Sequence, residues 1–128
     1  MASKNLMYKV SGKPNKEIVE KLNENEHIFF RFQEPHQKLT SRSESWGMIY
    51  GSKREALAEG YEILPGKSCT DKLEDLSQWA VYYDNNYVVV AFEGHDTGVV
   101  GDDGECVATY YKKIAVWNYE DVANYISD

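Results

Sequence analysis

The sequence predicts an α+β domain: a small, mixed or mostly antiparallel β-sheet with about four short helices. Short runs rich in β-branched and aromatic residues favour strands, and amphipathic segments that begin with capping residues favour helices. The two kinds of segment do not alternate regularly, and the chain has no internal repeat. No Gly-rich phosphate-binding fingerprint follows a strand, which argues against a doubly wound parallel sheet.

Length and charge limit the possible classes. The chain has 128 residues, which suits one domain over residues 1–128 better than two. The formal net charge of −7 argues against general binding to nucleic acid or anionic membranes, because phosphate binding needs clustered Lys and Arg. No apolar run has the length of a membrane span or a signal-peptide core. We therefore expect an intracellular, cytoplasmic protein with reduced cysteines.

The most hydrophobic run, residues 87–94, predicts a strand that is buried on both faces. Asn85 and Asn86 indicate a turn before this strand, and Gly94 ends it. A polar, Gly-rich and mostly acidic loop is expected from there to Glu105. Such a loop on a stiff strand is a common place for functional residues.

The first half of the chain predicts four elements. Residues 1–14 are expected as an edge strand or a frayed end, and Asn15 caps a helix that runs to about residue 25. Residues 27–33 predict a strand, and residues 46–51 a short third one. Alternation along the 27–33 strand places one set of residues, Ile28, Phe30 and Phe32, on one face and another set, Phe29, Arg31 and Gln33, on the opposite face.

The second half continues with helices and strands. Ser52 and Glu55 form a capping box for a helix to about residue 61, and Ser68 or Thr70 is expected to cap the next helix. Asn118 is expected to cap the last helix. Further strands are expected at residues 80–83, 105–111 and 114–117, with a break or a bulge at residues 112–113.

Several of these elements carry side chains suited to a nucleotide. Arg31 interrupts an apolar strand, Ser43 and Ser45 precede Trp46, Tyr50 ends the third strand, and Glu105 begins a late strand. In this order, over about residues 28–117, the chain resembles the ADP-ribosyltransferase superfamily. The resemblance implies a small split-sheet fold that binds NAD in a cleft between two halves.

The resemblance also implies roles for these residues. Arg31 would bind the phosphates or a ribose of NAD through its planar donors, and Tyr50, or one of Ser43 and Ser45, would hold the nicotinamide. Glu105 would hydrogen-bond a ribose hydroxyl and stabilise the oxocarbenium centre that forms as the nicotinamide–ribose bond breaks. The protein would then be a transferase-type enzyme with NAD as its cofactor.

Two functions from other classes remain open. The chain could be a non-enzymatic acidic protein that docks on the basic, nucleic-acid-binding groove of a partner, as small phage-encoded inhibitors do. It could also bind a nucleotide without catalysis. Nucleotide binding without catalysis would use the same cleft. If these residues have only structural roles, Arg31 would be ion-paired with a partner such as Glu93 or Glu105, and Tyr50 would be a packing residue.

Cysteine and metal chemistry are less favoured. Cys69 is expected at a helix N-terminus, where the helix dipole would lower its pKa, and His95 or His36 could serve as its base. Asp71 and Glu74 oppose a thiolate, so a structural cysteine is the preferred interpretation. The acidic loop lacks the ligand spacing of a calcium-binding EF-hand, and the cysteines and histidines lack zinc spacing, so no metal site is predicted.

Overall fold

The computed structural model describes residues 10–45, 52–101 and 103–127. Its main feature is a four-stranded antiparallel sheet in the order β1-β5-β6-β4, accompanied by a two-stranded sheet of β2 and β3. Three α-helices and two 3₁₀ segments complete the described part of the chain. The predicted α+β class is therefore confirmed, with an antiparallel main sheet.

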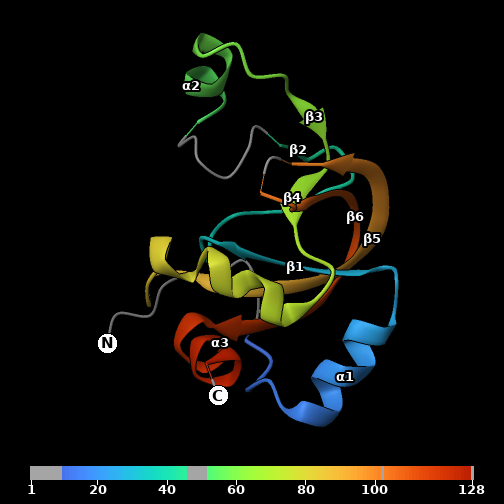
Figure 1. Cartoon of the computed structure of the whole chain (residues 1–128), viewed down its shortest axis with the longest axis vertical. Helices are drawn as coiled ribbons and strands as arrows, with labels where there is room; N and C mark the ends of the chain where they lie inside the picture. The colour runs from blue at the N-terminus through green and yellow to red at the C-terminus, as the bar shows by residue number, and fades with distance from the viewer. Residues whose placement is uncertain (1–9, 46–51, 102, 128) are drawn as a thin grey trace.

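A long hairpin of β5 (Val88–Val100) and β6 (Cys106–Asn118) forms the centre of the sheet. Both strands bend strongly (Figure 1), and their register shifts at three places, between Ala91 and Phe92, Glu93 and Gly94, and Asp96 and Val100. Such bulges bend and twist a strand pair. The expected loop after Gly94 was wrong, because β5 continues to Val100. The break expected as one alternative at residues 112–113 is wrong, because β6 is continuous there; the bulges lie on either side of this pair, at Tyr111 and Ile114.

The bent hairpin brings the two outer strands of the sheet together. These are β1 (Ile28–Gln33), which pairs with β5, and β4 (Lys67–Cys69), which pairs with β6. Just beyond β4, Thr70 bridges to Phe30: the N–H of Phe30 donates to the Thr70 carbonyl at 2.8 Å, and the N–H of Thr70 donates back at 2.9 Å. The sheet is thus closed on itself. The prediction that Ser68 or Thr70 caps a helix was wrong, because Ser68 lies in a strand and Thr70 forms this bridge.

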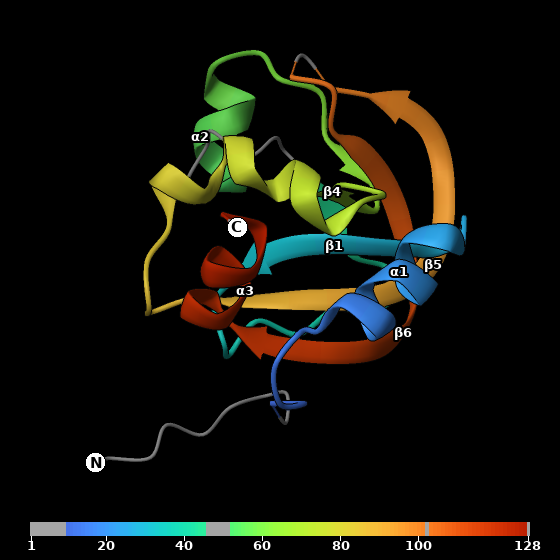
Figure 2. The ribbon, with the colours of Figure 1, turned by 60° about the horizontal axis from the view of Figure 1, so that its bottom comes forward.

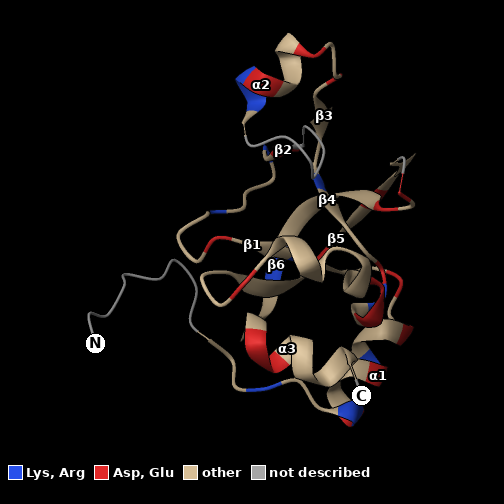
Figure 3. Cartoon of the chain, turned by 60° about the vertical axis from the view of Figure 1, so that its left-hand side comes forward, with Lys and Arg blue, Asp and Glu red and all other residues tan. Residues whose placement is uncertain are grey.

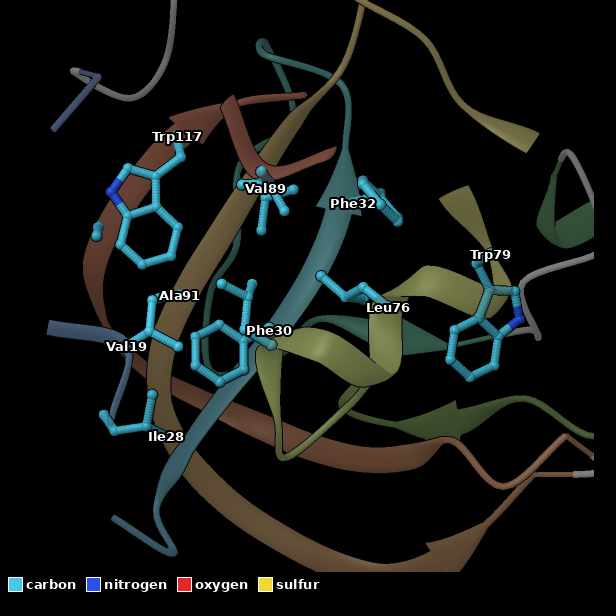
Figure 4. Packing of buried hydrophobic residues seen from close by; sticks show 12 residues of the cluster. Val19, Ile28, Phe30, Phe32, Leu76, Trp79, Val89, Ala91 and Trp117 are labelled. Atoms are coloured by element: carbon cyan, nitrogen blue, oxygen red, sulfur yellow. The ribbon is translucent and has the colours of Figure 1, made fainter. Parts of the chain in front are cut away.

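Helices cover one face of the sheet (Figure 2): α1 (Lys16–Glu24), α3 (Tyr119–Ile126) and the 3₁₀ segments η1 (Leu73–Gln78) and η2 (Ala80–Tyr82). Figure 4 shows Leu76 of η1 pointing toward Phe30 and Val89 of the sheet. We call this set the helix-side core: Val19, Ile28, Phe30, Phe32, Leu73, Leu76, Trp79, Val89, Ala91, Ala115, Trp117 and Val122. The strand expected at residues 80–83 was wrong, because Ala80–Tyr82 forms a 3₁₀ turn.

The opposite face of the sheet buries a second core. Its members are Phe29, Leu39, Cys69, Val88, Val90, Phe92, Ala108 and Val116. The alternation predicted for the 27–33 strand is confirmed, because Ile28, Phe30 and Phe32 belong to the helix-side core and Phe29 to the second core.

A smaller unit projects from the sheet at the top of Figure 1. It contains α2 (Lys53–Ala58) and the two-residue strands β2 (Glu44–Ser45) and β3 (Leu64–Pro65). The hydroxyl of Ser52 accepts from the N–H of Glu55 at 3.1 Å, which confirms the predicted N-cap. The strand predicted at residues 46–51 lies outside the described residues, as does most of the N-terminal edge strand or frayed end predicted for residues 1–14.

Candidate functional site

Arg31 lies in β1 on the face of the sheet that carries the second core. It stands opposite Val90 of β5, a member of that core, and its side chain is half-buried. Its Nη1 donates to the carbonyl of Ser68 at 3.3 Å. This contact crosses from β1 to β4 and depends on the closed sheet. The guanidinium is therefore held against the backbone of β4.

Lys67 lies on the same face, in β4. It stands opposite Ala108 and two residues before Cys69, both of the second core, and it is only 7 % exposed. The pKa of Lys67 is lowered to about 8, first by burial and then by the charge of Arg31, while Glu44 acts in the opposite direction. Two cationic side chains, one from each outer strand, thus lie within electrostatic reach of each other.

Ser43 and Glu44 approach β4 from the small unit. The carbonyl of Ser43 accepts from the N–H of Gly66 at 2.8 Å, next to Lys67. The Ser43 hydroxyl accepts from the N–H of Thr40 at 2.9 Å, so it also shapes its own turn. Glu44 forms a 2.8 Å ion pair with Lys53 of α2. Arg31 and Ser43, both predicted site residues, therefore contact neighbouring parts of the segment 66–68.

Ser45 is placed by its backbone alone. Ser45 pairs with Leu64 through the backbone of β2 and β3. Tyr50 lies outside the described residues, so its predicted contact with nicotinamide stays a prediction.

Glu105 is engaged within its own loop. It is 8 % exposed, its Oε1 accepts from the N–H of Asp103 at 3.2 Å, and its carbonyl accepts from the N–H of Gly101 at 2.8 Å. Its carboxylate occupies the space that a Cβ at Gly101 would need. Among the described residues, no hydrogen bond or ion pair joins Glu105 to Arg31. The structure therefore does not bring these two predicted site residues into contact.

Gln33 and Lys67 are polar residues of this face to which the sequence assigned no role. Gln33 is 2 % exposed and donates through Nε2 to the carbonyl of Gln37 at 3.2 Å, and its Oε1 has no hydrogen-bond partner in the described part of the chain. The alternation from Phe29 through Arg31 to Gln33 placed Gln33 on the correct face. Lys67 gave no such signal, because it was expected in a turn.

The cysteine hypothesis is corrected by the position of Cys69. This residue lies in β4 rather than at a helix N-terminus, and it is fully buried. Burial raises its pKa far above the usual range, and Cys106 and Asp96 add to the increase, which outweighs the opposing effect of Arg31. No helix dipole activates the thiol, so a Cys69–His hydrolase site is excluded.

Two surface hollows lie away from these residues. One is lined by residues of α1, η1 and α3, among them Asn23, Glu74 and Tyr125. The other, where β5 bends, is lined by residues that include His27 and His95. Neither is lined by Arg31, Ser43, Ser45 or Glu105. Within the described ranges, no group of three or more His, Cys, Asp or Glu residues is placed to hold a metal ion.

Comparisons with protein-family models, curated proteins and solved structures gave no match to this chain. No helix in the described ranges is both long and apolar enough to cross a membrane. The site must therefore be interpreted from its own geometry and charge.

Proposed function

We propose that the protein binds a nucleotide diphosphate of the NAD class, and that Arg31 and Lys67 contact the diphosphate. The observation that carries this proposal is the position of two cationic side chains from different strands on one face of the sheet. Burial and the neighbouring guanidinium make the charged form of Lys67 unfavourable in the free protein, which lowers its pKa to about 8. A bound dianion would stabilise that charge.

The two cations differ in what they offer a ligand. A guanidinium such as that of Arg31 can donate two parallel hydrogen bonds to a phosphate, whereas an ammonium such as that of Lys67 acts as a compact charge. Gln33, with an amide oxygen that has no hydrogen-bond partner among the described residues, adds an acceptor for a ribose hydroxyl. Ser43 lies at the other end of the 66–68 segment and would approach the opposite end of the ligand.

Cleavage of the nicotinamide–ribose bond is a further part of this hypothesis, with Glu105 as the stabilising carboxylate. For that role the Glu105 carboxylate would have to leave the N–H of Asp103 and its place over Gly101. Binding by Arg31 and Lys67 does not require this movement. Binding and cleavage are therefore tested separately.

Ligand-observed NMR with NAD, and with inorganic pyrophosphate as the minimal probe, tests binding. We expect NAD signals to broaden with wild type, and Lys67→Met to weaken the affinity by roughly ten- to a hundredfold, the usual value of a charge-assisted hydrogen bond. Lys53→Met is the matched control, because it removes a nearby exposed lysine that is already paired with Glu44. The affinity of that variant should stay within about twofold. Absence of broadening at millimolar NAD and pyrophosphate would refute the proposal.

Proton uptake gives a second measurement. Near pH 8 about half of the Lys67 side chains are neutral, since the pKa is about 8. Binding of the diphosphate should raise that pKa, so each binding event should take up as much as about half a proton. Calorimetry in buffers of different ionisation enthalpy measures this uptake, which should vanish in Lys67→Met.

The cleavage hypothesis is tested by the release of nicotinamide from NAD. Free nicotinamide should form in wild type and not in Glu105→Gln; an equal rate in both would remove Glu105 from the mechanism.

A second candidate function is docking on a basic protein partner, and it is favoured by the carboxylates around Cys106. The pKa of Cys106 rises to about 11, first through burial and then through nearby carboxylates, those of Asp71, Asp96, Asp75 and Glu105. Asp and Glu also mark the turn between β5 and β6 (Figure 3). Reversing the charges of Asp71, Asp75 and Asp96 should weaken capture of a basic partner and flatten its salt dependence. Binding that salt does not change would count against docking of this kind.

A further inference from the structure

We propose that Cys69 and Cys106 are a modification site: a dithiol pair that a small-molecule disulfide of the glutathione class oxidises to a disulfide across β4 and β6. The two residues stand directly opposite each other in the antiparallel β4–β6 pair. Side chains at opposite positions of such a pair project from the same face. Both thiols are free in the structure.

The backbone geometry suits a disulfide. Directly opposite Cα atoms in an antiparallel pair are about 4.5–5.5 Å apart, which falls inside the range of about 4.4–6.8 Å that disulfides span. The Sγ of Cys69 lies 3.8 Å from the carbonyl oxygen of Cys106, so the thiol already rests against the partner strand. The two sulfurs can therefore be joined by side-chain rotation, without moving either strand.

The two thiols differ in access, which sets the order of the steps. Cys69 is fully buried, whereas Cys106 is partly exposed and can meet a reagent. The Cys106 thiolate attacks one sulfur of the small disulfide, forms a mixed disulfide and releases one thiolate. Cys69 then loses its proton and attacks the Cys106 sulfur, which forms the protein disulfide and releases the second thiolate. The small disulfide gains two electrons and two protons and becomes two thiols, and the protein dithiol loses them.

Burial and nearby charges make this oxidation slow at neutral pH. Burial raises the pKa of Cys106 to about 11, and four carboxylates contribute: Asp71, Asp96, Asp75 and Glu105. The pKa of Cys69 is raised by burial, by Cys106 and by Asp96, and Arg31 acts in the opposite direction. The rate should therefore rise nearly tenfold per pH unit between about pH 7 and pH 10, as the thiolate of Cys106 accumulates. The site would respond to sustained oxidation rather than to brief exposure.

Oxidation would also act on the strand that carries Lys67. The β4 strand is three residues long, and a covalent link at Cys69 would fix its end to β6. The link closes the chain between residues 69 and 106, which restricts the unfolded state and should raise the melting temperature by several degrees. This part of the inference does not rest on the proposed nucleotide binding, because the disulfide forms whether or not a ligand is bound.

The test treats the reduced, folded protein with oxidised glutathione at pH 8.5 and follows the intact mass. Wild type should lose about 2 Da without retaining glutathione, and a peptide map should join Cys69 to Cys106. Cys69→Ser should stop at one glutathione on Cys106, and Cys106→Ser should stay unmodified because Cys69 is buried. The double variant Asp71→Asn/Asp96→Asn should react severalfold faster at pH 7.5, since a lower thiol pKa increases the thiolate fraction more than it reduces nucleophilicity.

Two results would overturn the proposal. One is wild-type protein that accumulates the glutathione adduct at Cys106 without closing the disulfide, which would mean that the Cys69 sulfur does not reach it. The other is wild-type protein that stays unmodified while folded and reacts only in denaturant. Both results are measured on the wild-type protein, so the test remains valid even if a variant fails to fold.

Discussion

Replacing Gly66 by alanine should destabilise the protein through two separate effects. Gly66 has a φ of +93°, in the left-handed region, where an alanine costs about 1–2 kcal/mol. A Cβ at this position would also lie 2.6 Å from the carbonyl oxygen of Ala108 in β6. Because that atom belongs to the backbone of a paired strand, relief requires β4 and β6 to shift, which costs about 1–3 kcal/mol. The total loss should be roughly 2–5 kcal/mol.

Gly98→Ala is the matched control. Gly98 has a φ of +86° in the same sheet, but no atom lies within 4 Å of where its Cβ would be. It should lose only the conformational cost of about 1–2 kcal/mol. Urea unfolding followed by circular dichroism measures both variants, and their shared effect on unfolded-chain entropy cancels in the difference. Equal losses in the two variants would refute the steric argument and the close approach of Gly66 to β6.

Three further predictions concern charge, capping and the core. The folded-state pKa of Lys67, about 8, lies below its ordinary value of 10.5, so the unfolded chain binds more protons between these values and stability must rise with pH there. From pH 7.5 to 9.5, wild type should gain roughly 2 kcal/mol relative to Lys67→Met in urea unfolding; a constant difference would contradict the shift. Asn15→Ala should cost about 1 kcal/mol, because the Asn15 side chain accepts from the N–H of Ile18 at 2.9 Å. Asn118→Ala should change thermal stability by at most a few tenths of a kcal/mol, since the Asn118 side chain makes no capping hydrogen bond, and equal losses in the two variants would argue against this distinction. Leu73→Ala should cost about 2–5 kcal/mol because Leu73 is fully buried, whereas Leu57→Ala, at a residue 55 % exposed, should cost under about 0.5 kcal/mol; similar denaturation midpoints would contradict the assigned burial.

Local signals in the sequence predicted the elements that depend on neighbouring residues. Alternation assigned both faces of β1, and the caps at Asn15 and Ser52 begin α1 and α2 as expected. These features follow from spacings of two to four residues, which are visible in a single chain.

The missed features depend on residues far apart in the sequence. β4 is three residues long and forms because Lys67–Cys69 pairs with residues of β6. No local sequence pattern predicts this pairing. The outer part of β5 is polar and contains glycine, yet it is a strand because β6 pairs with it. Arg31 and Lys67 come close together because the sheet closes. The sequence therefore predicted Arg31 as a site residue but not its cationic neighbour, Lys67. The sequence predicts that Glu105 can contact a ligand. Its contacts with Gly101 and Asp103 form only in the folded loop, so no local pattern predicts them.

Closure of the sheet also bears on self-association. A row of unpaired backbone groups on an outer strand is a template for adding a strand from another copy of a chain. The Phe30–Thr70 bridge occupies the middle of the side of β1 that would otherwise offer such a row. The outer part of β5 lies beyond the end of β1, but Gly98 and the register shift after Asp96 interrupt it, and Asp96 places an exposed charge there. The described sheet therefore presents no long, flat edge, which should keep the folded protein from polymerising by strand addition even at high concentration.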